Sequence, residues 1–216
     1  MNRRHLLTGA MAFASLGAAP LVRADNRAER LFRILRGGSD IGRHQLAVTP
    51  GAEGLEVAID IDIRVRVLGI TAYRYSLTNR EVWKDGALVR LDSQTDDDGT
   101  DERVTLRRSG DLLEIDGTGY SGTAPISAAT TSYYAPDFVT RRPWISTQSG
   151  QPLDIATEVR NGGSLKRVIV TGDLEKTIVY DANGEWVASE FDAGGEPARY
   201  EVIEQSGRIA ALWQSA

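Results

Sequence analysis

Cysteine is absent from this chain of 216 residues, and histidine occurs only as His5 and His44. Without cysteine the chain can form no disulfide, no thiolate metal site and no lipid-bearing cysteine behind a leader. Zinc and copper centres use two or three histidines or add thiolates, so the sequence gives no support for them. It therefore predicts no metal and no cofactor, and stability must come from packing and strand pairing.

Catalytic patterns are also lacking. A Ser-His-Asp triad would have to use His44 as its base, and Gly119-Tyr120-Ser121-Gly122 carries its second glycine one place too early for a nucleophile elbow. No Gly-x-Gly-x-x-Gly follows a strand and opens a helix, and no P-loop is present. Glycosidase carboxylates stay open, because any of the 30 acids could serve. We predict a partly exposed His44 on a strand, assign no catalytic residue, and favour a protein that is not an enzyme.

Long apolar runs are scarce. The run from Leu6 to Leu21 is too short and too rich in Gly and Ala to remain as a membrane-spanning helix, which needs about 20 strongly apolar residues. No later segment comes closer to that requirement. We expect no transmembrane segment in the mature chain.

The N-terminus has the features of a removable export signal. Arg3 and Arg4 precede the apolar run, and a small-residue exit ending at Ala24 follows it. Asn2 to Leu7 resembles the twin-arginine signal, in which apolar residues stand two and three places after the paired arginines. An ordinary secretory signal with two charges is the alternative. We predict that residues 1–24 are a signal peptide of the twin-arginine type and that the mature protein is soluble in the periplasm.

Residues 25–216 have an acidic balance. Removing the leader takes away three of the 25 basic side chains and none of the 30 acidic ones, which leaves 22 against 30 and a net charge of −8. Nucleic acid is therefore not expected as a partner, because phosphate binding needs clustered positive charge. The remaining 192 residues suffice for one domain with a sizeable core, and no linker divides them. We predict a single antiparallel β domain.

What the chain has in abundance is alternation of apolar and polar residues. In Leu55 to Val67 every odd position is aliphatic and the even positions are mainly charged, which predicts a strand with one buried face. At about 3.3 Å per residue this strand would span roughly 40 Å, so it must coil strongly, as in a barrel or a wrapped half-barrel. Tyr73, Tyr75 and Trp83 mark the same face of the next strand.

Hairpin signals recur to the end of the chain. They are Lys84-Asp85-Gly86, Asp96-Asp97-Asp98-Gly99, Arg108-Ser109-Gly110-Asp111, Asn161-Gly162-Gly163, Asp181-Ala182-Asn183-Gly184, Ala193-Gly194-Gly195 and Ser206-Gly207. Short strands separated by such turns are typical of an all-β sandwich or barrel. We predict an all-β, mainly antiparallel fold in which a single sheet wraps into a barrel or half-barrel.

The stretch from Asp96 to Glu102 is the one dense carboxylate cluster. When Gly99 is set at the invariant glycine of the calcium-loop pattern, Gln94 occupies the first ligand position and Thr105 the last. Neither residue is the ligand that the pattern has there. We favour a solvated acidic turn, with a calcium site as the alternative.

The alternation breaks between Ser127 and Pro152, which predicts a short helical or loop crossover near residues 127–152. Arg141-Arg142-Pro143-Trp144, which follows Tyr134 and Phe138, is the one place where aromatic and basic residues mix. This segment could form the rim of a ligand cavity, with arginine holding an anionic head and the rings covering apolar groups. It could equally be a lid packed over one end of the barrel, with its arginines paired to acids.

Five stretches distributed between residues 32 and 200 of the chain carry a further signal: Phe32 to Gln45, Glu81 to Leu88, Thr95 to Gly99, Tyr180 to Trp186 and Phe191 to Tyr200. Together they resemble a family of proteobacterial exported proteins known only as a domain of unknown function. The resemblance implies an antiparallel sheet wrapped around a helical or loop plug, similar to the half-barrels of periplasmic lipoprotein carriers, which hold acyl chains in an apolar concavity. It implies no catalytic residues, and a shared fold is a weak guide to function.

We therefore favour a non-enzymatic periplasmic protein that binds an apolar or amphipathic, lipid-like ligand in its concave β face. The candidate ligand-binding residues come from the aromatic strand and the crossover: Tyr73, Tyr75, Trp83, Tyr134, Phe138, Arg141, Arg142 and Trp144. The alternative is a structural or assembly partner in the cell envelope without a small-molecule ligand. A carrier needs an accessible apolar cavity, whereas an assembly protein should be solid inside with an exposed patch.

Overall fold

The structure is a computed structural model that describes residues 27–215, so the predicted signal peptide lies outside the described residues. A single sheet of 13 strands dominates it, and every pair of neighbouring strands is antiparallel. The all-β, mainly antiparallel fold predicted from the alternation is therefore confirmed. No helix within residues 27–215 is long and apolar enough to cross a membrane.

In the order of the sheet, its strands are β12 (Ile155–Gly162), β13 (Leu165–Gly172), β14 (Lys176–Tyr180), β15 (Trp186–Asp192), β16 (Pro197–Ser206), β1 (Ala28–Arg36), β2 (Ser39–Pro50), β3 (Leu55–Val67), β4 (Ile70–Lys84), β5 (Ala87–Asp97), β6 (Thr100–Ser109), β7 (Leu112–Gly117) and β8 (Ser121–Pro125).

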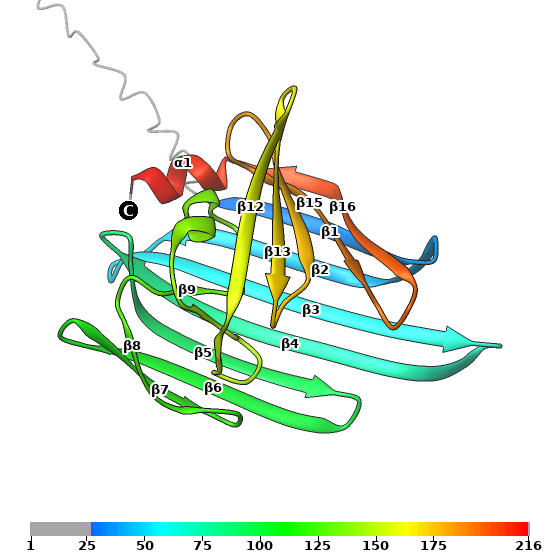
Figure 1. The fold of residues 1–216 in the computed structure, drawn as a ribbon, viewed down its shortest axis with the longest axis horizontal. Coiled ribbons are helices and arrows are strands. Elements are labelled where there is room, and N and C mark those ends of the chain that lie inside the picture. Colours follow the sequence, from blue (N-terminus) through cyan, green and yellow to red (C-terminus); the bar gives the residue numbers. More distant parts are fainter. Residues whose placement is uncertain (1–26, 216) are drawn as a thin grey trace, which may run out of the picture.

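The sheet curls on itself without closing. Strand β1 pairs with both β2 and β16, so the first and last strands are neighbours in the middle of the sheet, and β12 and β8 form its two free edges. Figure 1 shows β12 and β13 crossing over β2, β3 and β4. This is the wrapped half-barrel that the long alternating strand predicted.

Strands β3 and β4 form the longest hairpin of the sheet. The bounds of β3 are those predicted from the sequence, and its partner β4 begins three residues later. The register places Tyr73 opposite Val65 and Tyr75 opposite Ile63, so the aromatic residues of β4 share a face with the aliphatic residues of β3, as predicted. That face is the concave side of the sheet, where Val57 and Ile59 enter the core.

Three successive hairpins turn through two residues that both have positive φ. The turns are Leu68-Gly69, Asp85-Gly86 and Asp98-Gly99, with φ of 52° at each first residue and 69° to 91° at the glycines. Positive φ at both central residues is the geometry of a type I′ turn, whose twist matches that of paired strands. The predicted turns at Asp85 and Asp98 are confirmed, and they carry the Asp-Gly pair that this geometry favours. The first turn has leucine in that place.

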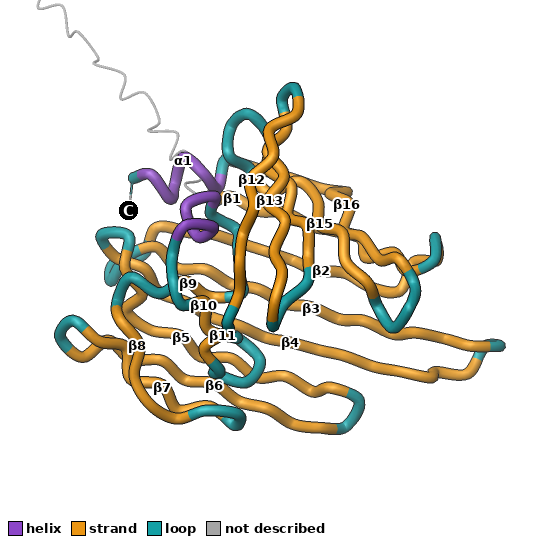
Figure 2. Tube along the Cα trace, viewed as in Figure 1, coloured by secondary structure: helices purple, strands orange, loops and turns teal. Residues whose placement is uncertain are grey.

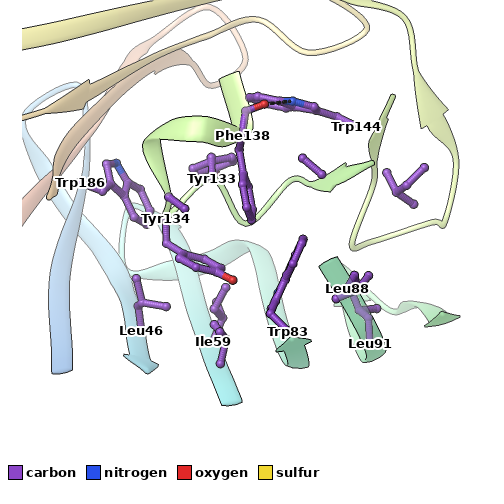
Figure 3. Close-up of a cluster of buried hydrophobic side chains, with 14 of the residues drawn as sticks. Leu46, Ile59, Trp83, Leu88, Leu91, Tyr133, Tyr134, Phe138, Trp144 and Trp186 are labelled. Carbon is purple, nitrogen blue, oxygen red and sulfur yellow. Dashed lines mark hydrogen bonds between the residues drawn. The ribbon is translucent and has the colours of Figure 1, made fainter. Parts of the chain in front are cut away.

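The crossover segment lies on the concave side of the sheet. Its elements are β9 (Ala129–Thr130), the 3-10 helix η1 (Pro136–Thr140), β10 (Trp144–Ile145) and β11 (Pro152–Leu153), of which the strands form a small second sheet. Figure 3 shows Tyr134 and Phe138 of this segment pointing toward Ile59 and Trp83 of the large sheet. The predicted short helical or loop crossover is thereby confirmed, and its side chains fill much of the half-barrel.

A short helix near the C-terminus, α1 (Ile209–Gln214), was not predicted. The backbone N–H groups of Ile209 and Ala210 donate to the Glu185 carboxylate at 3.2 Å each, which satisfies groups that a helix start leaves free. The same carboxylate pairs with Arg30 at 2.7 Å, and both side chains are at most 5% exposed. Figure 2 shows α1 beside η1 at one end of the molecule. A buried acid from the turn between β14 and β15 therefore fixes this helix, and no local pattern shows such a contact.

Candidate ligand-binding cavity

The concave face of the sheet borders a cavity of about 380 Å³ that is partly open to solvent. Residues of β3 and β4, of β14 to β16 and of the crossover segment line it. Its larger lining side chains are Ile59, Ile61, Ile63, Leu77, Leu153, Leu174 and Phe191, with Tyr73, Tyr75, Tyr133 and Tyr200. Sites for small molecules have volumes of about 300–1,000 Å³ and mostly apolar walls. This cavity has the size and lining of a small site of that kind.

Lys176, at the start of β14, is the one lysine or arginine among the residues that line the cavity. Its Nζ donates a hydrogen bond to the Tyr133 hydroxyl at 2.6 Å. The same atom lies 4.7 Å from the ring centroids of Tyr133 and Phe191 and 5.1 Å from that of Tyr200. Within residues 27–215 no carboxylate oxygen lies within 4.0 Å of it. Burial lowers the pKa of Lys176, while the three ring faces favour its charged form. The cavity thus holds a cation that has aromatic partners and, among residues 27–215, no carboxylate in salt-bridge contact, although Asp173 also lines the cavity.

The two predicted tyrosines of β4 belong to a polar rim of the cavity. The Tyr73 hydroxyl donates to Asp97 at 2.7 Å, and the Tyr75 hydroxyl donates to the Gln148 side-chain oxygen at 3.4 Å. Gln148 in turn donates to Asp97 at 3.3 Å. Of the residues predicted to bind a ligand, Tyr73 and Tyr75 are therefore the ones that the structure brings to the cavity.

A buried carboxylate lies next to the cavity wall. Glu81 is 2% exposed and accepts hydrogen bonds from Asn79, Trp83 and Ser132 at 2.8, 2.6 and 2.5 Å. Asn79 and Ser132 also line the cavity. Burial raises the pKa of Glu81, and the three donors oppose that rise. Glu81 therefore holds a polar part of the wall in place, one hydrogen bond away from the cavity.

The prediction of a partly exposed His44 is wrong. His44 is 2% exposed because it occupies an inward position of β2, where its ring packs against those of Phe32, Trp186 and Tyr200. Neither ring nitrogen has a hydrogen-bond partner within the described residues. Burial, with a smaller contribution from the charge of Lys176, lowers the pKa of His44 to about 3. His44 is therefore a neutral core residue.

This burial makes stability depend on pH. The unfolded chain takes up a proton on His44 near pH 6.5, whereas the folded protein does so only near pH 3, so stability should fall as the pH falls between these values. The loss should be about 1.4 kcal/mol per pH unit. We expect His44→Leu to flatten the dependence between pH 7 and 5, measured by urea unfolding of both proteins. Burial raises the pKa of Glu81, which changes stability with pH in the opposite direction to His44. Glu81 is present in both proteins, so the difference between their pH dependences reports His44 alone. Equal slopes would contradict the assignment.

Four of the predicted residues lie in an aromatic cluster away from the cavity: Trp83, Tyr134, Phe138 and Arg141, packed with Trp213 of α1. The three rings among them are at most 1% exposed. The Arg141 guanidinium lies 5.6 to 5.7 Å from the rings of Trp83, Phe138 and Trp213 and pairs with Asp137 at 2.7 Å. This is the arrangement of the packed lid, with an arginine paired to an acid.

The last two predicted residues anchor the crossover. Trp144 is fully buried and donates its indole N–H to the Phe138 carbonyl oxygen at 2.8 Å. Arg142 donates to the Val139 carbonyl oxygen at 3.1 Å and to the Thr157 hydroxyl of β12 at 2.8 Å. Trp144 therefore holds the crossover segment together, and Arg142 also links it to the edge strand β12 of the large sheet.

Sequence reasoning missed Lys176, although its position carried a signal. Lys176, Ile178 and Tyr180 alternate along β14, so the lysine occupies an inward position. Glu81 likewise stands on the face of β4 that Trp83 marks. A charged residue at an inward position of an alternating strand must find buried partners or face a cavity.

Other parts of the described surface offer weaker candidates. Two depressions of about 580 and 610 Å³ on the convex face are lined mainly by exposed charged and polar residues, which pair with one another, as Arg107 does with Asp92 at 2.5 Å. Within residues 27–215 no three His, Asp or Glu side chains are placed to hold a metal ion. In the acidic stretch from Asp96 to Glu102, the Asp96 carboxylate accepts a hydrogen bond from the backbone N–H of Gly99 at 2.7 Å, as in a hairpin turn.

The model of a protein family, a domain of unknown function named DUF6134, matches residues 32–203. The chain belongs to this family. The resemblance drawn from five stretches of the sequence is thereby confirmed at the level of a domain of unknown function. No curated protein matches this DUF6134 chain.

A solved structure supports the fold of the DUF6134 chain. It is the crystal structure of a beta-barrel-like protein of the domain of unknown function DUF1849 from Brucella abortus. The two superpose with a TM-score of 0.56 at 10% sequence identity, covering 83% of this chain and 97% of the other. At that identity the likeness concerns the fold alone.

Proposed function

We propose that this DUF6134 protein binds an amphipathic ligand, with an anionic head and an apolar tail, in the concave cavity. The observation that carries the proposal is Lys176, a cation on an apolar cavity with no carboxylate within 4.0 Å among residues 27–215. An ammonium group held away from water is stabilised by a nearby anion, and a carboxylate or phosphate head would supply one. Arg3, Arg4 and the apolar run after them support binding outside the cytoplasm.

The tail and the head contribute in different ways. Each Å² of apolar surface removed from water contributes roughly 25 cal/mol, so the walls around Ile61, Ile63 and Leu174 would supply much of the affinity. A charge-assisted hydrogen bond contributes about 1.5–3 kcal/mol, so Lys176 would supply the selectivity for an anion. We infer a binding role and assign no catalytic residue; the neutral, buried His44 has no hydrogen-bond partner among residues 27–215 through which to act as a base.

Decanoate and decan-1-ol are matched probes for this site. We expect decanoate to bind at least about tenfold more tightly, because only its head is an anion that Lys176 can pair with. Lys176→Met keeps the apolar walls and should abolish that difference while decan-1-ol binding stays the same. Isothermal titration calorimetry of both proteins with both probes measures the effect.

Lys84→Met is the control, because Lys84 is an exposed lysine at the end of β4 and does not line the cavity. It should bind both probes as the unchanged protein does. Native mass spectrometry of protein purified after export adds a second readout, a co-purified amphiphile. If neither probe binds and native mass spectrometry shows no co-purified amphiphile, the proposed function fails. The alternative, a structural or assembly partner in the cell envelope, then gains support.

A further inference from the structure

The tip of the β3–β4 hairpin exposes three large apolar side chains. Leu68 is 98% exposed, Ile70 74% and Val67 57%, more than any other large apolar side chain in residues 27–215. Figure 1 shows this tip projecting beyond the ends of the neighbouring strands. Apolar side chains gathered at one exposed place mark a contact with a partner or a membrane, whereas single ones need no explanation.

Leu68 also occupies a turn position that does not suit it. Its φ of 52° equals that of Asp85 and Asp98, the first residues of the two following type I′ turns. Aspartate, asparagine and glycine adopt this left-handed conformation readily, and leucine does not. Because Leu68 is almost fully exposed, its side chain makes no packing contribution that would offset the unfavourable conformation. A residue that breaks a local rule without stabilising the fold points to a role outside it.

The tip is flanked by positive charge on an otherwise acidic protein. From Arg64 to Arg74 the hairpin carries three arginines and no acid. Arg64 stands directly opposite Arg74, a like-charge pair that destabilises a sheet in isolation. Arg64 has one exposed ion pair, with Asp62 at 3.3 Å, and within residues 27–215 no carboxylate oxygen lies within 4.0 Å of the guanidinium group of Arg66 or Arg74. The backbone N–H of Arg74 donates to the Asp98 carboxylate at 3.3 Å. These charges suit an anionic partner.

The apolar tip continues the stripe that lines the cavity. Val67 pairs with Ile70, on the face that carries Tyr73 and Tyr75. The nearest acidic turn reaches Arg74, whose backbone N–H donates to the Asp98 carboxylate at 3.3 Å, and the four further residues to Ile70 extend about 14 Å at 3.4 Å per residue. The Debye length at physiological salt is about 8 Å, so the acids beside Arg74 are largely screened from the tip.

We propose that the β3–β4 tip docks on the surface of an anionic lipid bilayer. Leu68, Ile70 and Val67 enter the boundary between head groups and acyl chains, and the flanking arginines contact lipid phosphates. The interaction is independent of the proposed function. Where both hold, docking brings the cavity next to the membrane, which is a source of amphipathic anions.

Co-sedimentation with vesicles of equal parts phosphatidylglycerol and phosphatidylethanolamine tests the docking. The unchanged protein should sediment with them, and Leu68→Asp should weaken the partition at least about tenfold, because it removes an apolar side chain and adds a charge of the wrong sign. Aspartate is the residue of the two neighbouring turns with the same φ, so the variant should fold at least as well, as thermal unfolding will show.

Leu112→Asp is the matched control, since Leu112 is 47% exposed and lies on β7, outside the hairpin. It should sediment as the unchanged protein does. Replacing both Arg64 and Arg74 with glutamine should weaken the partition about tenfold or more, as should vesicles of phosphatidylcholine alone. All variants share the same N-terminus, so any contribution of residues 1–26 cancels.

Three results would overturn the docking. The unchanged protein could stay in solution with the anionic vesicles, Leu68→Asp could sediment as strongly as the unchanged protein, or the unchanged protein could be a dimer that Leu68→Asp dissociates, which would assign the tip to a second copy. Decanoate titration of Leu68→Asp separates this proposal from the cavity, because that variant should still bind the probe.

Discussion

Replacing Glu185 with alanine should lower the free energy of unfolding by about 3–5 kcal/mol. The carboxylate is 4% exposed and pairs with Arg30, which is 3% exposed, at 2.7 Å. Its removal leaves a buried guanidinium without its counter-ion and takes the acceptor from the first N–H groups of α1. Urea unfolding followed by circular dichroism measures the loss.

Two further variants separate the unpaired charge from the loss of contacts. Arg30→Met combined with Glu185→Leu should recover most of the stability, because an apolar pair of similar volume leaves no buried charge. Glu190→Ala breaks a half-exposed pair with Arg167 at 3.2 Å and should cost less than about 1 kcal/mol. If Glu185→Ala costs no more than Glu190→Ala, the buried pair does not hold α1.

Trp83→Ala should also destabilise the protein by about 3–5 kcal/mol. Trp83 is fully buried, and its ring centroid lies 5.0 Å from that of Phe138 and 5.2 Å from that of Trp213, so it joins the large sheet to both the crossover and α1. Alanine would leave a cavity between these three elements. The loss is measured from the urea midpoint and slope of the variant against the unchanged protein.

Trp83→Phe distinguishes the packing of the ring from its hydrogen bond. Phenylalanine keeps most of the apolar volume but removes the indole N–H, which donates to the buried Glu81 carboxylate at 2.6 Å. We expect a loss of about 1–3 kcal/mol from this donor. Equal losses for Trp83→Ala and Trp83→Phe would show that the hydrogen bond, and not the ring, stabilises this junction.

The sheet could be predicted from the sequence because its signals are local. The alternation in Leu55–Val67 has a period of two over the whole strand, and the Asp-Gly pairs at Asp85 and Asp98 have the conformation that their turns require. Each of these features depends on residues that are neighbours in the chain. The same holds for the break in alternation that indicated the crossover.

The candidate site was harder to predict because its geometry depends on distant contacts. Lys176 meets the ring of Tyr133 only because the sheet curls until β14 faces the crossover. His44 is buried for the same reason, and α1 depends on an acid in the turn before β15. Trp83 and Phe138 were grouped with the ligand site because aromatic residues suit both a cavity and a core, and only the packing distinguishes the two.

The position of β1 has a consequence for when the protein can fold. Its hydrogen-bonded neighbours are β2, which follows it at once, and β16, which ends at Ser206 near the C-terminus. During synthesis one side of β1 therefore remains an open edge until β16 has left the ribosome. Such late, distant pairing slows folding and leaves an edge to which other chains can add. A chain that stops before Pro197 keeps that edge open permanently, so loss of β16 should favour aggregation more than an internal deletion of the edge strand β12.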